Sequence, residues 1–192
     1  RQIQKIMEDE MQKMADKGRI GRKIRVMIVG IPNVGKSSFI NSLANQKHLA
    51  KVGNTPGKTK SINYYDVNNE FYIVDLPGYG YSNMTKVEKL NTSKLINHYI
   101  EKNENISHIL FLVDIRHKPT ENDRIMYDWL TSKNIPFTII ATKADKIGTT
   151  KQKENMQVIT KVLFAKENII PFSSSNKLNL DIIESIILEN IH

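Results

Sequence analysis

The sequence predicts an α/β fold with a mainly parallel, six-stranded sheet and helices on both faces. Short apolar runs rich in β-branched residues alternate with stretches of helical spacing along most of the chain. This alternation is typical of strand–helix–strand units, in which helices pack on a parallel sheet. The chain has 192 residues, of which 40% are hydrophobic. That length and composition suit the core of a single domain.

A separate helix is predicted ahead of this domain. The apolar residues of the stretch 3–16 recur at helical spacing, roughly on one side: Ile3, Ile6, Met7, Met11 and Met14. Gly18 ends the pattern, because glycine commonly follows the last turn of a helix. We therefore expect an amphipathic helix over residues 1–18 and the domain over residues 19–192. The apolar side suits packing on the domain, with docking to a partner as the alternative.

The first strand and the first helix of the domain flank a loop that contains two glycines. The apolar, β-branched run over residues 24–29 predicts a buried strand. Residues 36–45 have helical spacing, with Phe39, Ile40 and Leu43 on one side. The loop between them therefore leads from the end of a strand into the N-terminus of a helix.

Two further strands form the only antiparallel pair that we expect. They cover residues 61–67 and 70–75, with Asn68-Asn69 as the turn between them. The alternation then resumes, with helices near 86–102, 120–133, 151–165 and 178–190 and strands near 107–113, 136–141 and 168–172. An open, mainly parallel sheet binds ligands beyond the carboxyl ends of its strands, so the loops at that edge are the candidates for function.

The loop after the first strand carries the clearest motif. Gly30 to Ser37 fit the pattern G-x-x-x-x-G-K-[ST]. In this setting backbone N–H groups bind phosphates, Lys36 reaches the β- and γ-phosphates, and the Ser37 hydroxyl ligates Mg²⁺. A chance glycine–lysine turn is the alternative, but the flanking strand and helix argue against it. The candidate nucleotide contacts here are Gly30, Ile31, Pro32, Asn33, Val34, Gly35, Lys36, Ser37 and Ser38.

A second motif predicts which base is bound. Thr142-Lys143-Ala144-Asp145 directly follows the predicted strand at 136–141. The Asp145 carboxylate can accept hydrogen bonds from the N1–H and the 2-amino group of guanine, whereas adenine has no such pair of donors. Lys143 can lay its alkyl chain over the purine face. Taken alone, this tetrapeptide would also suit a solvated turn.

A third motif, Asp75-Leu76-Pro77-Gly78, closes the predicted strand at 70–75. Asp75 suits a carboxylate that supports Mg²⁺ without ligating it directly, and the Gly78 N–H can contact the γ-phosphate and sense its loss. An ordinary strand-ending turn is the alternative. The order of this motif between the other two favours the nucleotide role.

Two weaker loops complete the set. In the first, Thr55-Pro56-Gly57-Lys58-Thr59, we expect a switch segment in which Gly57 and Lys58 contact nucleotide and Thr59, in preference to Thr55, gives Mg²⁺ a second hydroxyl. In the second, Ser173-Ser174-Ser175 follows the last strand and can offer N–H groups to the guanine O6. A plain loop with a helix cap is the alternative for the serines.

In this order the five motifs resemble the sequence boxes of Ras-like P-loop GTPases. Over about residues 38–192 the chain looks like the EngB family, also called YihA or YsxC, in the stretches Pro56-Gly57-Lys58-Thr59, Val74-Asp75-Leu76-Pro77-Gly78-Tyr79-Gly80-Tyr81, Val113-Asp114-Ile115-Arg116-His117, Ala141-Thr142-Lys143-Ala144-Asp145-Lys146 and Phe172-Ser173-Ser174. Residues 1–37, notably the expected helix that ends at Lys17-Gly18 and the loop from Gly30 to Ser37, look more like the ribosome biogenesis GTPase A family. The chain thus has the features of a natural or engineered hybrid.

The resemblance implies a GTPase that hydrolyses GTP to GDP and phosphate. It implies a switch in large-ribosomal-subunit assembly that is needed for normal cell division. The alternative is a GTP-responsive module that binds RNA or the ribosome and hydrolyses GTP incidentally. A metabolic P-loop kinase is disfavoured, because Asp145 selects guanine and no acceptor-substrate domain is present.

The residue after Gly78 suggests slow intrinsic hydrolysis. Many GTPases place a water-orienting glutamine there, and this chain has Tyr79. In the potassium-activated GTPases that the chain resembles, an asparagine at the position of Asn33 helps to hold K⁺ against the phosphates, so K⁺ joins Mg²⁺ as a candidate cofactor. A loop amide that bonds its own backbone is the alternative. The candidates for catalysis are Lys36, Asn33 and Gly78.

The formal net charge of +8 points to a phosphate-rich partner. Basic residues gather at the front and around the expected switch: Lys13, Lys17, Arg19, Arg22, Lys23, Arg25, Lys47, Lys51, Lys58 and Lys60. Ribosomal RNA of the large subunit is the expected partner, with a generic solvated surface as the alternative. The sequence has no cysteine, no run of roughly 18 apolar residues and no basic-then-apolar leader. We therefore expect a cytoplasmic protein that does not bind membranes. We also expect a monomer that does not bind DNA.

Overall fold

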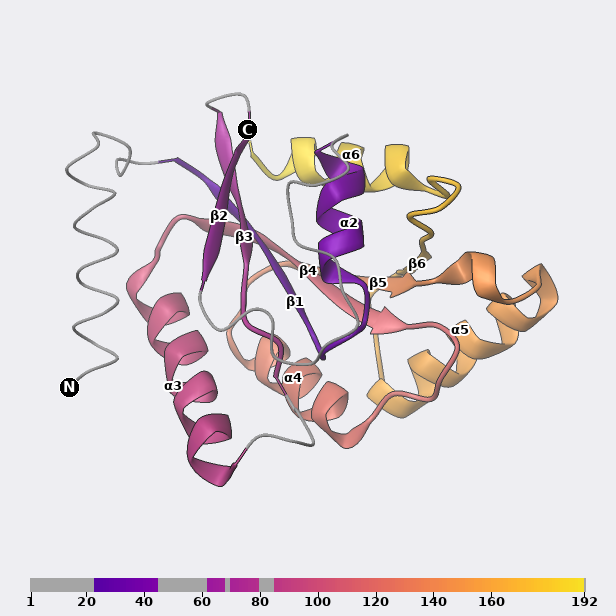
Figure 1. Ribbon diagram of the computed structural model, residues 1–192, viewed down its shortest axis with the longest axis horizontal. Coiled ribbons are helices and arrows are strands. Elements are labelled where there is room, and N and C mark those ends of the chain that lie inside the picture. The colour runs from indigo at the N-terminus through magenta and orange to yellow at the C-terminus, as the bar shows by residue number, and fades with distance from the viewer. Residues whose placement is uncertain (1–22, 45–61, 68–69, 80–84, 192) are drawn as a thin grey trace.

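In the part of the chain that the structure describes, six strands form one sheet in the order β2-β3-β1-β4-β5-β6. The computed structural model describes residues 23–44, 62–67, 70–79 and 85–191 (Figure 1). The strands are β1 (Arg25–Gly30), β2 (Asn63–Val67), β3 (Phe71–Asp75), β4 (Ile106–Asp114), β5 (Phe137–Thr142) and β6 (Ile169–Pro171). Neighbouring strands are parallel except for β2 and β3, which form an antiparallel pair at one edge.

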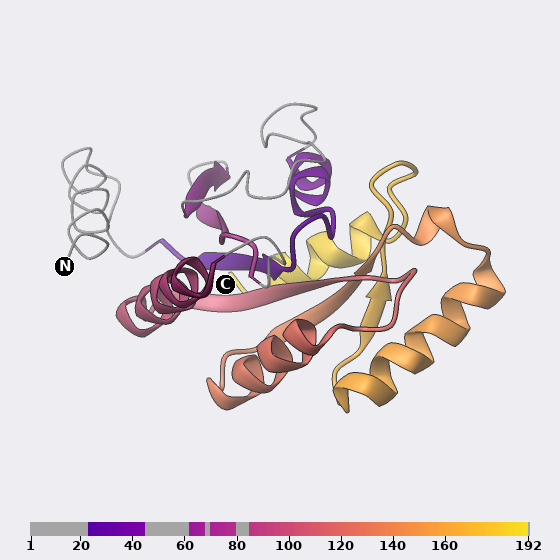
Figure 2. The same cartoon turned by 60° about the horizontal axis from the view of Figure 1, so that its bottom comes forward.

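Helices cover both faces of this sheet and enclose a separate apolar core on each (Figure 2). One face carries α2 (Lys36–Leu43) and α6 (Leu180–Glu189), and the other carries α3 (Lys86–Lys102), α4 (Glu121–Ser132) and α5 (Thr149–Leu163). The central strand β1 supplies both cores, since Val26 and Ile28 face α2 and α6 whereas Met27 and Val29 face the other three helices. A strand buried on both faces needs an unbroken apolar run, which is what the sequence has from Val26 to Val29.

The strand register brings the candidate loops to one edge of the sheet. Ile28 of β1 pairs with Asp75 of β3 on one side and with Leu110 of β4 on the other. At the end of β4, Asp114 pairs with Thr142 of β5. The residues that follow the carboxyl ends of β1, β3, β4 and β5 therefore lie next to one another.

The fold class predicted from the sequence is confirmed, including the antiparallel edge pair. In the described part of the chain, each predicted helix and strand, α5 included, begins and ends within two residues of the prediction. The helix expected over residues 1–18 and the switch loop expected over residues 55–59 lie outside the described residues. Among the described helices, none combines the length and hydropathy needed to cross a bilayer.

Candidate guanine nucleotide site

The predicted phosphate loop joins β1 to α2, and its backbone shape requires the two glycines of the motif. Gly35 has a φ of 100° and directly precedes α2, a conformation that residues with a Cβ rarely adopt. A Cβ on Gly30 would lie 2.8 Å from Val34 Cγ1 and 2.9 Å from the carbonyl oxygen of Leu112 on β4. The loop thus turns tightly against the middle of the sheet before the helix begins.

Lys36 begins α2 and is buried beside the end of β3. Its Nζ donates to Asp75 Oδ1 at 2.8 Å and to the carbonyl of Leu76. The Lys36 and Asp75 side chains are only 9% and 3% exposed. A buried ion pair of this kind contributes little net stability because both charges lose hydration. It does bring together the two charged groups that the sequence assigned to phosphate and to Mg²⁺.

The segment after β3 runs against the phosphate loop. A Cβ on Gly78 would lie 3.2 Å from the backbone nitrogen of Pro32, so only a residue without a side chain fits this approach comfortably. The Leu76 side chain is fully buried in the core and offers only its backbone to the site. The first and third predicted motifs are therefore neighbours.

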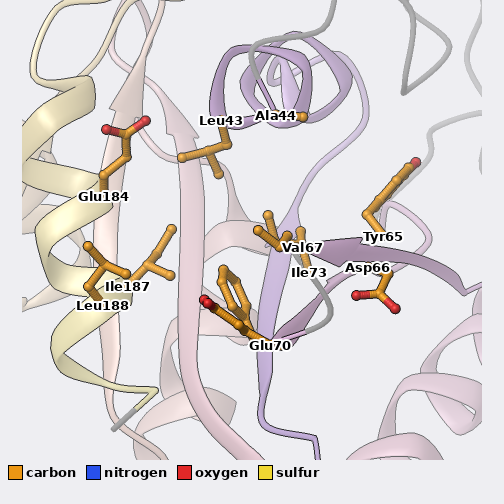
Figure 3. Close-up of a pocket in the computed structure, with 11 residues that line it drawn as sticks. Leu43, Ala44, Tyr65, Asp66, Val67, Glu70, Ile73, Glu184, Ile187 and Leu188 are labelled. Carbon is orange, nitrogen blue, oxygen red and sulfur yellow. The ribbon is translucent and has the colours of Figure 1, made fainter. Parts of the chain in front are cut away.

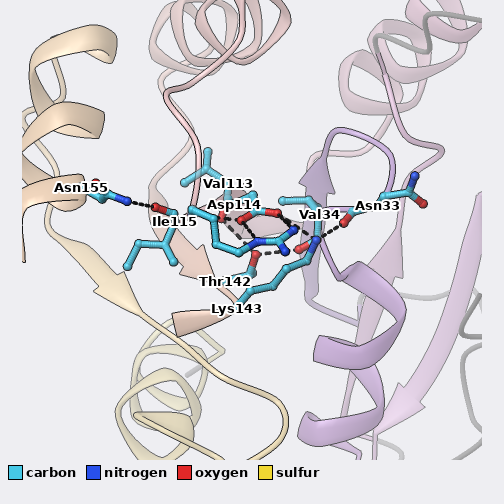
Figure 4. Close-up of polar contacts among 9 residues, drawn as sticks. Asn33, Val34, Val113, Asp114, Ile115, Thr142, Lys143 and Asn155 are labelled. Carbon is cyan, nitrogen blue, oxygen red and sulfur yellow. Dashed lines mark hydrogen bonds and ion pairs between the residues drawn. The ribbon is translucent and has the colours of Figure 1, made fainter. Parts of the chain in front are cut away.

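The base motif is bonded directly to the phosphate loop (Figure 4). The Thr142 hydroxyl donates to the Val34 carbonyl at 2.6 Å. Lys143 Nζ donates to the Asn33 carbonyl at 2.5 Å and to Asp114 Oδ2 at 2.8 Å. Residues more than a hundred positions apart in the sequence are thus tied together by side chains that hold backbone carbonyls.

Asp114 is a member of this site to which the sequence analysis gave no role. Its carboxylate accepts from Arg116 Nε at 2.9 Å and from a terminal guanidinium nitrogen of Arg116 at 2.8 Å, besides the Lys143 ammonium. Burial raises the pKa of Asp114, but the hydrogen bonds from Arg116 and Lys143 outweigh burial and lower that pKa to about 2. In the sequence, Asp114 ends a buried strand and lies in one of the stretches that carry the family resemblance, but neither feature points to Lys143.

Asp145 and the serine loop, each of which the sequence assigned to the base, lie together. Ser173 is fully buried, and its hydroxyl donates to Asp145 Oδ1 at 2.8 Å. Ser175 bonds the same hydroxyl through its Oγ and its backbone N–H, and Ser174 lies between them in the chain. Burial raises the pKa of Asp145, but the bonds from Ser173 and Lys146 outweigh it and lower the pKa. The carboxylate is therefore oriented and ionised.

The side chain of Tyr79 is buried in the core that α4 helps to form, and it reaches the start of that helix. Its hydroxyl donates to Asp123 Oδ1 at 3.3 Å, and burial, followed by the nearby Asp123 charge, raises the Tyr79 pKa well above its usual value. Asp123 also closes the capping box of α4 with Thr120. This orientation agrees with the expectation that Tyr79 does not hold the attacking water.

The oxygen donors at this site suit Mg²⁺ bound together with phosphates. Mg²⁺ commonly uses one or two protein oxygens, with water and phosphate oxygens as its other ligands. Ser37 lies in the first turn of α2 and Asp75 lies against the preceding residue, Lys36. The described residues contain no group of three or more histidine, cysteine or carboxylate side chains that could hold a metal alone. A Mg²⁺ site here would therefore depend on the nucleotide.

A cavity of about 350 Å³ lies elsewhere, between α2, α6 and the β2–β3 edge (Figure 3). Its floor is apolar, with Leu43, Ile73 and Ile187 among the lining residues, and its charged groups are the carboxylates of Asp66, Glu70 and Glu184. Carboxylates repel phosphates, so this cavity does not suit a nucleotide.

Of the predicted site residues, Gly57, Lys58 and Thr59 lie outside the described part of the chain.

Comparison with known proteins gives consistent results. Residues 25–143 match the family described as 50S ribosome-binding GTPase. The chain is 44% identical over 172 residues to the probable GTP-binding protein EngB of Clostridium kluyveri, covering 86% of this chain and 87% of that protein. It is 43% identical over 173 residues to the EngB of Clostridium beijerinckii, covering 88% and 87%. Since 88% of 192 residues is about 169, that alignment starts no later than about residue 24 and includes the phosphate loop.

Solved structures are similar in the same way. The crystal structure of a probable GTP-binding protein EngB matches with a TM-score of 0.74 and 26% identity, over 87% of this chain and 98% of that chain. Era in complex with MgGDPNP and nucleotides 1506–1542 of 16S ribosomal RNA matches with a TM-score of 0.68 and 26% identity. This second match covers 88% of this chain and 57% of the Era chain.

Proposed function

Since the chain belongs to the EngB family of P-loop GTPases, we propose that it is a Mg²⁺-dependent GTP switch in assembly of the large ribosomal subunit. Its action would be needed for normal cell division. Because ribosomes are assembled in the cytoplasm, the proposal also implies a cytoplasmic protein. Residues 1–18 would form an amphipathic helix that precedes the GTPase domain.

The observation that carries the GTP assignment is the direct bonding of the base motif to the phosphate loop. Thr142 and Lys143 hold the carbonyls of Val34 and Asn33 at 2.6 and 2.5 Å. A guanine held by Asp145 and a phosphate chain held by the loop would therefore belong to one ligand. The fixed relation between the two loops favours a guanine nucleotide over a simple phosphate compound.

Each part of the site has a distinct role in this proposal. Asp145, oriented by Ser173, would accept hydrogen bonds from guanine, and residues Ser173 to Ser175 would supply N–H groups to its O6. The backbone N–H groups from Gly30 to Ser38 and the Lys36 ammonium would bind the phosphates. Lys36 would also stabilise negative charge that develops on the phosphates during hydrolysis.

Mg²⁺ would be held by the hydroxyls of Ser37 and Thr59, with Asp75 supporting it. When bound, this ion neutralises phosphate charge during hydrolysis. The Gly78 N–H, at the end of the segment that runs against Pro32, would distinguish a nucleotide with a γ-phosphate from one without it. That difference is what makes a switch.

Intrinsic hydrolysis would be slow, because Tyr79 stands where many GTPases have a water-orienting glutamine. The Tyr79 hydroxyl is instead bonded to Asp123 on α4. We propose that K⁺, held with the help of Asn33, supplies the missing positive charge. Asn33 has an exposed side chain and a left-handed backbone with a φ of 62°. Its amide is therefore presented outward from the phosphate loop.

The ribosomal assignment has separate support. The matched family is described as 50S ribosome-binding, and the similar Era structure contains a ribosomal RNA fragment. The net charge of +8 suits a partner rich in phosphate. The second candidate is a module that binds RNA in response to GTP and hydrolyses it incidentally, which the slow hydrolysis expected from Tyr79 favours.

Multiple-turnover GTP hydrolysis separates these two candidates. The rate is measured for the protein alone, with purified large ribosomal subunits, and with small subunits as the matched control. We expect large subunits to raise the rate about tenfold or more, because one group that stabilises the transition state contributes ~10²–10³. If GTP-dependent binding occurs with no stimulation, the RNA-binding module is the better description.

A further inference from the structure

The Lys143 side chain links three parts of the site. Its Nζ contacts Asp114 Oδ2 at 2.8 Å and the Asn33 carbonyl at 2.5 Å. Its alkyl chain passes over the phosphate loop, since a Cβ on Gly35 would lie 3.9 Å from Lys143 Cε. Together with the Thr142–Val34 bond, this ammonium group therefore holds the base loop against the phosphate loop.

The backbone at Lys143 also depends on its surroundings. Its φ is 62°, in the left-handed region that residues other than glycine adopt at an energetic cost. Such a conformation persists only where neighbouring contacts hold it. The two contacts of the Lys143 ammonium, in Figure 4, are contacts of this kind.

Asp114 is built to hold that ammonium in one place. Its side chain is 11% exposed, and both of its oxygens are fully engaged. Oδ1 accepts from the backbone N–H of Arg116 at 3.1 Å and from Arg116 Nε at 2.9 Å. Oδ2 accepts from a terminal nitrogen of Arg116 and from Lys143, each at 2.8 Å. A planar guanidinium bound at two points fixes the plane of the carboxylate.

We propose that Asp114 is a positioning residue for guanine nucleotide binding, which acts through Lys143 and is itself oriented by Arg116. It holds the Lys143 side chain between the base loop and the phosphate loop and so slows the release of GDP and GTP alike. The inference rests on the proposed function, because it concerns the same nucleotide site. It assigns Asp114 and Arg116 no contact with the nucleotide.

The test is the dissociation rate of a fluorescent GDP derivative from the full chain. Asp114→Asn keeps the size of the side chain but removes its charge. A hydrogen bond to a charged group contributes more than a neutral one, so we expect release to be about tenfold faster. Arg116→Lys keeps the charge but not the two-point contact and should give a smaller increase. Asp128→Asn, at an exposed position of α4, makes the same charge change and should leave the rate unchanged.

A double-mutant cycle separates positioning from a general structural effect. In a Lys143→Met background, which keeps most of the alkyl chain, Asp114→Asn should change the release rate by less than about twofold. If the two substitutions multiply independently, Asp114 acts through something other than Lys143 and the inference is overturned.

The remaining outcomes are also decisive. If Asp114→Asn releases GDP at the wild-type rate, the inference is overturned while the GTPase assignment stays intact. Failure of the wild-type protein to bind GDP overturns the assignment and the inference together. Should Asp114→Asn fold poorly, as thermal unfolding would show, Arg116→Lys and Arg116→Gln carry the test, and wild-type release from both would contradict it.

Discussion

Replacing Asp145 by Asn should move the base preference of the protein from guanine towards xanthine. In the structure, Asp145 Oδ1 accepts from Ser173 at 2.8 Å and Oδ2 lies 3.0 Å from the Lys146 ammonium. Asn keeps one carbonyl oxygen for Ser173, so the loop should keep its shape. The second oxygen becomes an amide that donates hydrogen bonds, which suits the 2-oxo group of xanthine and opposes the 2-amino group of guanine.

The size of the effect follows from the bonds that are lost. Two hydrogen bonds from guanine to a charged acceptor contribute about 1.5–3 kcal/mol each. Their loss corresponds to a weakening of GDP binding by ~10²–10⁴. Sites built to pair polar edges discriminate by up to ~10⁴–10⁵ against a ligand that lacks the matching group, so the estimate is of the expected order. Binding of xanthosine diphosphate should improve in the same variant.

Titration calorimetry with both diphosphates measures this directly. Asp128→Asn is the matched control, and it should bind GDP as the wild-type protein does. Thermal unfolding of Asp145→Asn near the wild-type temperature would show that the loop is intact. If the variant still prefers guanine, Asp145 does not read the base. If it binds both nucleotides poorly and unfolds early, Asp145 has a structural role instead.

Four further outcomes are expected. Lys36→Ala should weaken GTP and GDP binding strongly, because it removes a charge that pairs with phosphate; near-wild-type affinity by calorimetry would contradict the phosphate-loop assignment. Hydrolysis should be faster in K⁺ than in Na⁺ at equal ionic strength, and Asn33→Ala should abolish the difference while leaving GDP affinity nearly intact. Equal rates in the two salts, both in the presence and in the absence of ribosomal subunits, would refute this. Exchange of GDP for a GTP analogue should alter amide hydrogen exchange in residues 53–60 and 78–90, because these segments are expected to respond to the γ-phosphate; identical exchange would argue against a switch. Because the pKa of Asp114 is lowered from 3.8 to about 2, its ionised form stabilises the fold by ~2 kcal/mol above about pH 4, and this contribution is lost as the pH falls through 2. The free energy of unfolding in urea, measured against pH, should therefore lack this acid-sensitive part in Asp114→Asn. The same pH dependence in the variant and the wild-type protein would contradict this.

The fold was predictable because its signals are local and agree with one another. The apolar run from Val26 to Val29 needs burial on both faces, and two cores meet at β1. The glycines of the phosphate loop follow from backbone geometry, since Gly35 is left-handed and Gly30 has no room for a Cβ. The apolar run and the left-handed turn are local features, and the close approach of Gly30 to Leu112 falls on a glycine of the motif, so the sequence shows all three.

The role of Asp114 was not predictable in the same way. Its contact with Lys143 depends on the pairing of β4 with β5 and on a side chain that extends back across the phosphate loop. The contact of Tyr79 with Asp123 likewise depends on where α4 begins. Sequence spacing places residues along an element, but such long-range contacts are set by strand register and helix packing.

The central claim is that GTP controls the affinity of this protein for the large ribosomal subunit. The most direct measurement is the dissociation constant for purified large subunits of the protein loaded with a non-hydrolysable GTP analogue and of the protein loaded with GDP, at one fixed salt concentration. The account predicts tighter binding with the GTP analogue by about tenfold or more, which is the usual range for coupling between two sites. Equal affinity in the two nucleotide states, or binding to small subunits only, would contradict it.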